Sequence, residues 1–300
     1  MKNSTYGCYR YFLVPFDQIS MSQMLVHDRK ALFESIINNN DTQIEDTNDN
    51  IKYKLYIIEN IGNLYFFKFS KQTYTTTYKD TGNDIKENII KNNPFVHIII
   101  NTELQIILIQ KKTTVFKNYS LTINAFKKYI NLFLLSHGYE ITVDQLSDPK
   151  HFWQIIDTAE NVYQVDLNLK SPNMFEGITN AEEFAKTLKE VSNSTENNIN
   201  LKNDQGNLRL KKHFFKSFIE YIACGGGKWS AKAKFFGKKA KTYTSSNNLN
   251  QVELPSELND NTIKENTNKI EKILSDINKK PGDTISNDKK DKRNDDTKKS

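Results

Sequence analysis

Apolar and polar residues alternate along many short segments of the chain. A period of two is typical of β-strands that bury one face, and Gly, Pro or Asn residues separate most of these segments. Gly62 and Pro94 mark the starts or turns of two hairpins. The segments predicted as strands in this way are 5–16, 52–59, 63–69, 95–100, 104–110, 113–119, 139–146, 162–169 and 199–202.

Other segments repeat their apolar residues at helical spacing. The clearest stripe runs from Leu121 to Leu134 and precedes Gly138, which can adopt the left-handed conformation that ends a helix. A short helix is also expected within the polar stretch 70–93. The remaining predicted helices are 21–37, 149–157, 179–191, 208–224 and a weak one at 256–278.

These elements predict an α+β fold with mixed or antiparallel sheets and helices packed on one face. The polar break 192–198 divides a β-rich domain at 1–192, with an inner break near 138–148, from a basic subdomain at 197–244. Residues 245–300 are expected to form a polar tail. From position 279 its composition is that of a disordered segment, because it offers almost no apolar surface to bury.

Positive charge is concentrated in one segment. The formal net charge of the chain is +6, yet positions 201–244 hold eleven Lys or Arg residues and two acids, a local net charge of +9. Within a predicted hairpin at 228–244, which turns at Gly237, lysines alternate with Trp229 and small apolar residues. In an extended strand this pattern places ammonium groups on one face, and such a row of charges suits a polyanion.

The lysine row predicts a protein that binds nucleic acid without reading its sequence, because ammonium groups recognise phosphate charge rather than base edges. DNA is the expected ligand ahead of RNA, and Trp229 and Phe235 are expected to support the strand from the core. If the two faces are reversed, Trp229 would stack on single-stranded bases. Lysines that protect an exposed sheet edge from aggregation explain the pattern without any ligand. The candidate nucleic-acid contacts are Lys228, Lys232, Lys234, Lys239 and Lys241 on the hairpin, with Lys211, Lys212 and Lys216 on the preceding helix.

A metal-dependent nuclease is a second hypothesis. Asp166 and Lys170 share one strand face and come close to an Asp/Glu-x-Lys arrangement, with Asp157 as a further carboxylate, but an asparagine stands where a second ligand is expected. Arg209 and His213 form a pair typical of some ribonucleases at an unfavourable spacing. An enzyme is therefore less favoured, and no catalytic residue is assigned.

A third hypothesis is a protein-interaction module without nucleic acid, whose tail helix would use Ile263, Ile270 and Ile277, seven residues apart. No cofactor or metal site is expected, because the five histidines are dispersed. Cys8 and Cys224 lie in apolar segments that are typical of packed thiols. The chain lacks a secretion signal and a run of the roughly 20 apolar residues that a membrane helix needs, so a cytoplasmic protein without membrane insertion is expected.

Short matches link the chain to one known family over about residues 1–205. They are Met1-Lys2-Asn3 with Tyr6 and Tyr9-Arg10, the hairpin from Tyr53 to Phe69, the hairpin after Pro94, and the strand from Val162 to Leu169 followed by Ser171-Pro172. This order resembles the RexA family of phage-exclusion proteins of lambdoid prophages. The resemblance implies a non-enzymatic homodimer of two hinged domains that binds DNA nonspecifically and acts with a membrane-protein partner in abortive infection, an antiviral defence. It supplies no site residues, and the lysine hairpin departs from the family pattern.

Overall fold

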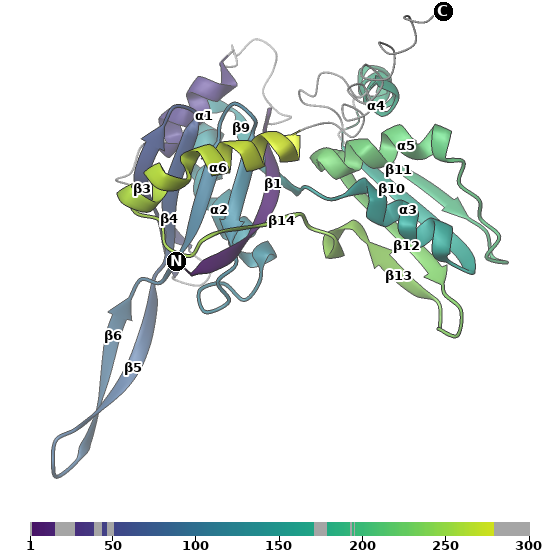
Figure 1. Cartoon of the computed structure of the whole chain (residues 1–300). Coiled ribbons are helices and arrows are strands. Elements are labelled where there is room, and N and C mark those ends of the chain that lie inside the picture. Colours follow the sequence, from purple (N-terminus) through teal and green to yellow (C-terminus); the bar gives the residue numbers. More distant parts are fainter. Residues whose placement is uncertain are drawn as a thin grey trace, which may run out of the picture. The chain divides into compact units, whose positions relative to one another are not determined.

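The computed structural model describes residues 2–15, 28–38, 44–46, 51–170, 179–192, 194 and 196–278, which Figure 1 shows with their elements labelled. They form two compact units of an α+β fold. The first unit contains residues from 1–148 and 244–266, and the second contains residues from 149–171 and 176–243. Helix α6 (Asp260–Asn278) begins in the first unit, and its residues from Thr267 are grouped with the second.

The first unit is built on an antiparallel sheet of eight strands in the order β14-β1-β8-β7-β4-β3-β2, with β9 also paired to β1. Its first strand extends from Asn3, and Pro15 ends it because proline has no N–H to donate. The strands are β1 (Asn3–Pro15), β2 (Ile44–Asp46), β3 (Ile51–Ile61), β4 (Leu64–Lys71), β7 (Phe95–Asn101), β8 (Ile106–Gln110), β9 (Tyr139–Gln145) and β14 (Gln251–Pro255).

Both faces of this sheet are buried in the central strands β4, β7 and β8. On one face, residues such as Phe67 and Ile98 form a core with α1 (Arg29–Ile37) and α2 (Tyr119–Leu134). On the other face, Phe66 and Ile99 are also fully buried. The backbone N–H of Leu258, just before α6, donates to Nε2 of His97 on β7 at 3.3 Å, which places the approach to α6 against that second face.

Local signals explain where α2 begins and ends. The side chain of Asn118 accepts a hydrogen bond from the N–H of Leu121 at 2.9 Å and so caps the helix. A 3₁₀ turn at Leu135–His137 follows, and Gly138 then adopts a left-handed conformation with φ of 76°, as predicted. The segment 113–119, predicted as a strand, instead forms a turn in which the N–H of Val115 donates to the carbonyl of Lys112 at 2.9 Å.

The polar stretch 70–93 was predicted to hold a short helix, and that prediction is wrong. It forms an antiparallel ribbon of β5 (Thr73–Asp80) and β6 (Ile85–Asn92), which pair only with each other among the described strands. Figure 1 shows this ribbon projecting from the eight-stranded sheet as an arm. β5 consists mainly of threonine and tyrosine, and both residue types favour strands.

The second unit places helices on one face of a four-stranded antiparallel sheet. Its strand order is β11-β10-β12-β13. Its elements are α3 (Pro149–Thr158), β10 (Asn161–Lys170), α4 (Thr179–Ser192), β11 (Glu196–Lys202), α5 (Lys212–Tyr221), a π-helical turn (Ile222–Gly226), β12 (Gly227–Lys234) and β13 (Lys241–Thr244).

The predicted inner break near 138–148 lies where the first unit gives way to the second, between Asp148 and Pro149. The boundary predicted between 192 and 197 lies inside the second unit, between α4 and β11. Strands from both sides of that polar break belong to one sheet, because β11 is hydrogen-bonded to β10 along its whole length.

Residues 245–278 are part of the folded protein rather than a polar tail. Strand β14 pairs with β1, and the weak helix predicted at 256–278 is present as α6. Ile263 and Ile270 are fully buried within the chain, and Ile277 is half-buried, so this stripe is not open to a partner helix as the third hypothesis required. Residues 279–300, for which disorder was predicted, lie outside the described residues.

Candidate nucleic-acid interface

The four-stranded sheet separates apolar from charged side chains as the alternation predicts. Along β12, Trp229 and Ala231 are buried, whereas Lys228 and Lys232 are exposed. The paired strand β10 has the same register, with Leu167 buried opposite Trp229. The sheet therefore has a dry face that belongs to the core and an open polar face that carries lysines.

Helices α3 and α5 cover the dry face (Figure 1). The ring of Phe152 on α3 contacts the ring of Trp229 edge-on, with centroids 5.1 Å apart. Helix α5 lies beside α3, since Lys212 forms an ion pair with Asp157 at 2.5 Å. Trp229 is thus a support for the strand, and the reversed arrangement in which it would stack on bases does not occur.

The open face brings together lysines, two carboxylates and uncharged polar groups from three strands. Register places Lys202 and Lys232 on either side of Gln164, and Lys228 opposite Asn168. We call this set the lysine face. It consists of Gln164, Asp166, Asn168, Lys170, Glu196, Asn198, Asn200, Lys202, Lys228, Ser230, Lys232 and Lys234.

Asp166 lies at the centre of the lysine face. Its carboxylate accepts hydrogen bonds from Nε2 of Gln164 at 3.0 Å, from the hydroxyl of Ser230 at 3.0 Å and from the side-chain amide of Asn200. The three donors are uncharged, so they orient the carboxylate without neutralising it. A negative charge in this position weakens the attraction of the neighbouring lysines for an anion.

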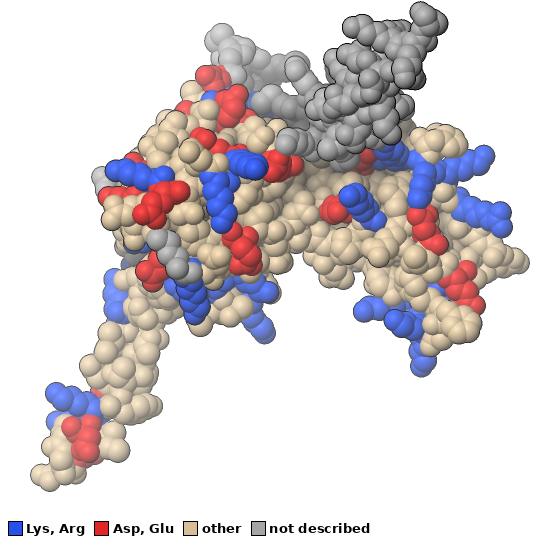
Figure 2. Space-filling model, in the orientation of Figure 1, with Lys and Arg blue, Asp and Glu red and all other residues tan. Residues whose placement is uncertain are grey.

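The hairpin lysines differ in their pairing. Nζ of Lys234 lies 3.1 Å from a carboxylate oxygen of Glu160, whereas Lys228 and Lys232 have no carboxylate within ion-pair distance in the described part of the chain. Lys239 and Lys241 are exposed near the hairpin turn, and Nζ of Lys241 lies 5.9 Å from the ring centre of Tyr243. Figure 2 shows a group of basic side chains over this hairpin, with acidic side chains close by.

The helix lysines do not join the lysine face. Lys211, Lys212 and Lys216 begin or lie on α5, which packs on the dry side of the sheet. Lys212 is paired with Asp157, and Nζ of Lys216 lies 3.7 Å from Glu220. The structure therefore separates the eight candidate lysines into two layers, and the helix and the hairpin do not present one common surface.

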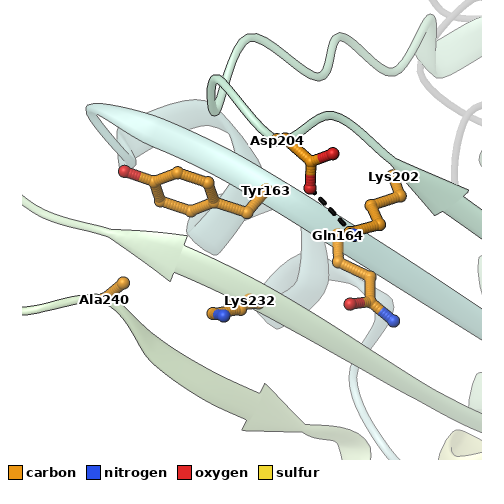
Figure 3. A pocket seen from close by; sticks show the side chains of 6 residues that line it. All are labelled: Tyr163, Gln164, Lys202, Asp204, Lys232 and Ala240. Carbon is orange, nitrogen blue, oxygen red and sulfur yellow. Dashed lines mark ion pairs between the residues drawn. The ribbon is translucent and has the colours of Figure 1, made fainter.

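A shallow pocket of about 270 Å³ opens on the lysine face. It forms where the register between β10 and β12 shifts around Tyr163, because a β-bulge re-aims the side chains beside it. Figure 3 shows Lys202 and Asp204 joined as an ion pair at one side of the pocket, with Nζ and Oδ1 2.8 Å apart. The lining residues are Tyr163, Gln164, Lys202, Asp204, Lys232 and Ala240.

Phe236 is an exposed aromatic residue on the hairpin that was not among the residues predicted to bind nucleic acid. It lies at the tip of the β12–β13 hairpin and is 90% exposed, whereas the preceding Phe235 contacts the ring of Tyr243. Gly237 follows with φ of 68°, which tightens the turn. The sequence contains two adjacent phenylalanines between lysines, which is a signal for a stacking surface. Only the turn geometry shows which of the two rings is exposed to solvent.

The glycines before Lys228 serve close packing rather than phosphate binding. A Cβ atom on Gly227 would lie 2.0 Å from the carbonyl oxygen of Asn168, and Gly227 has φ of 151°. A Cβ atom on Gly226 would meet the ring of Tyr221 at 2.3 Å. The segment is a buried, tightly packed turn between α5 and β12.

The residues of the nuclease hypothesis do not form one site. Asp166 faces outward from the sheet, whereas Asp157 lies in the helix layer on the other side and is paired with Lys212. Arg209 precedes α5, and His213 is on its first turn. Within the described ranges, no group of three His, Cys, Asp or Glu residues could hold a metal ion.

Cys8 is fully buried in β1, and burial raises the pKa of its thiol to about 12, so it is a packed thiol as predicted. Among the described helices, none is long and apolar enough to span a membrane. No protein-family model matches the chain, and no curated protein is similar enough to be counted as a relative.

Proposed function

We propose that this protein binds nucleic acid through phosphate contacts made by its lysine face, without reading base sequence and with DNA as the preferred ligand. The observation that carries the proposal is the exposure of Lys228 and Lys232 on one face, without a carboxylate partner in the described residues. Between positions 228 and 244 the chain has six lysines and no acidic residue. Such a ribbon releases counterions when it meets a phosphate backbone.

Supporting features surround these two lysines. Side-chain amides and a hydroxyl from β10, β11 and β12 lie on the same face, and groups of this kind donate hydrogen bonds to phosphate oxygens. Phe236 at the hairpin tip offers a ring on which an unpaired base can stack, while the lysines beside it hold the backbone. The role in abortive infection and the membrane-protein partner rest on the family resemblance alone and stay predictions.

The proposal is tested by titrating DNA with the full chain over a series of salt concentrations. We expect Lys228→Ala with Lys232→Ala to reduce the slope of log affinity against log salt by about 1.8, since each duplex phosphate contact contributes roughly 0.9. Affinity should fall about equally for unrelated sequences.

The matched control is Lys211→Ala with Lys216→Ala, which removes the same charge from the helix layer. Its salt slope should stay at the wild-type value. Equal effects of the two double variants would mean that net charge alone drives binding, and an affinity that does not depend on salt would refute the proposal.

A further inference from the structure

The arm formed by β5 and β6 has one apolar face that the described part of the chain leaves uncovered. Residues directly opposite each other in an antiparallel pair lie on the same face, and here Tyr74 faces Lys91, Thr76 faces Ile89, Tyr78 faces Glu87 and Asp80 faces Ile85. The exposed fractions are 66% for Tyr74, 70% for Tyr78, 66% for Ile85 and 63% for Ile89.

These four large side chains form a continuous stripe. Each lies diagonally across the ribbon from the next, in the order Tyr74, Ile89, Tyr78, Ile85, and diagonal neighbours of this size are within reach of each other. The opposite face is mostly polar and carries threonines, asparagines and two lysines, with Ile90 as its large apolar residue. The arm is therefore amphipathic, although its apolar side stays exposed among the described residues of its own unit.

A two-stranded ribbon with an exposed apolar face is unfavourable in water. An isolated pair of strands is marginally stable at best, and it gains stability when its apolar face is covered. Figure 2 shows an uncharged stretch along the arm, between charged groups near its base and near its tip. The arm has three basic residues (Lys79, Lys86, Lys91) and three acidic ones (Asp80, Asp84, Glu87), so its net charge is zero and it does not favour a polyanion.

The charges on the apolar face are arranged so that the face complements itself. Lys91 lies in the row nearest the base, whereas Glu87 and Asp80 lie in the two rows nearest the tip. If two arms stack face to face in opposite directions, the basic end of each meets the acidic end of the other, and the two apolar stripes cover each other. Stacking in the same direction would instead bring four carboxylates together, which is unfavourable.

We propose that the apolar face of the arm docks onto the same face of a second copy of this chain, antiparallel and related by a twofold axis. Each strand of eight residues spans about 27 Å at about 3.4 Å per residue. The two arms would each bury a few hundred Å², which is roughly half of a standard interface of about 800 Å² per partner. An interface of this size is typical of weak association that depends on protein concentration, and it does not depend on nucleic-acid binding.

The test uses sedimentation velocity of the full chain over a concentration series at low salt, where charge pairs are least screened. Wild-type protein should shift from monomer to dimer with concentration. Lys91→Glu should stay monomeric over the same range, because its arm then carries only negative charge on this face. Asp80→Lys with Glu87→Lys should stay monomeric as well, because its arm then carries only positive charge there.

Mixing these two variants should restore the dimer, because every basic end then meets an acidic end. Lys86→Glu is the matched control, since it reverses a charge on the polar face of the same ribbon and should dimerise like the wild type. A wild-type chain that stays monomeric throughout overturns the proposal. So does a dimer that survives in both charge variants, or a mixture that fails to restore the dimer lost in each.

Discussion

Substitution of Asp166 distinguishes a nucleic-acid-binding protein from a nuclease, because the two hypotheses predict different effects. Its carboxylate lies among the lysines of the open face, and uncharged groups hold it in place. An asparagine side chain at this position would keep the size and much of the hydrogen bonding. We therefore expect Asp166→Asn to raise DNA affinity several-fold, because one negative charge leaves the face that contacts phosphate.

The measurement is a DNA titration of Asp166→Asn and wild type at the same salt concentration, with a plasmid-cleavage assay in Mg²⁺ beside it. A nuclease that used this carboxylate would lose cleavage. A drop in affinity for the variant would contradict the binding mode proposed for the lysine face.

His97 should make the stability of the first unit depend on pH. Burial, followed by the charges of Lys68 and Lys112, lowers the pKa of His97 from 6.5 to about 4. Between these two values the unfolded chain binds a proton that the folded chain does not, so stability falls as pH decreases from 6.5 to 4 and is unaffected above that window. The loss amounts to at most about 3 kcal/mol.

Urea unfolding at pH 7 and pH 4.5 measures this effect. His97→Gln keeps a hydrogen-bond acceptor for the N–H of Leu258 but has no titrating group. Its free energy of unfolding should decrease less between the two pH values than that of the wild type. An identical decrease in both proteins would show that other groups are responsible.

At the scale of elements, an added methyl group should reduce the free energy of unfolding most in the turn before β12. Gly227→Ala would press its Cβ against the carbonyl oxygen of Asn168 in the neighbouring strand. We expect a loss of about 3 kcal/mol or more in the free energy of unfolding, because backbone must move and φ is unfavourable.

Gly237→Ala is the matched control, since nothing lies within 4 Å of its Cβ and only its φ of 68° is unfavourable. It should cost about 1 kcal/mol. Chemical denaturation of both variants makes the comparison, and similar losses at the two glycines would contradict the role of close packing at Gly227.

The type of an element could be predicted from the sequence where its two faces differ strongly in polarity. On β12 the alternation of lysine with tryptophan and alanine predicts both the strand and its exposed face, and the structure confirms both. On β5 and β6 the alternation is interrupted in the sequence, because threonine occupies both faces of β5 and the adjacent Ile89 and Ile90 of β6 lie on opposite faces. Val115 and Phe116 are buried but belong to a turn. Their segment was predicted as a strand because a few apolar residues do not distinguish a strand from a packed turn.

At the scale of the whole molecule, residues 245–266 complete the first unit. They supply β14 and the buried residues Leu254, Leu258 and Ile263. A chain that ends at Ser245 should therefore lose at least about 5 kcal/mol of stability, because several large buried side chains and a paired strand are removed.

Thermal unfolding measures the loss, and hydrogen exchange should locate it in the eight-stranded sheet while β10 and β12 stay protected. A chain that ends at Asn278 is the control and should unfold like the wild type. A stable, fully protected first unit in the shorter chain would refute this role for residues 245–266.

Unit boundaries and layers were beyond the sequence because they depend on which distant segments pair. β10 is hydrogen-bonded on both sides, to β11 and to β12, so a polar break between α4 and β11 does not separate domains. The same pairing decides that Lys232 faces solvent across the sheet from the helix that carries Lys216. Charge density along the chain could not reveal that the two lysines point away from each other.

The second unit interrupts the first in the chain, between β9 and β14. Ribosomes make residues 149–243 before β14 exists, so the Asn3–Gly7 edge of β1 stays bare while they emerge. A bare strand edge readily pairs with other chains. A chain that stops after residue 243 would therefore keep this edge unpaired and would be prone to aggregation.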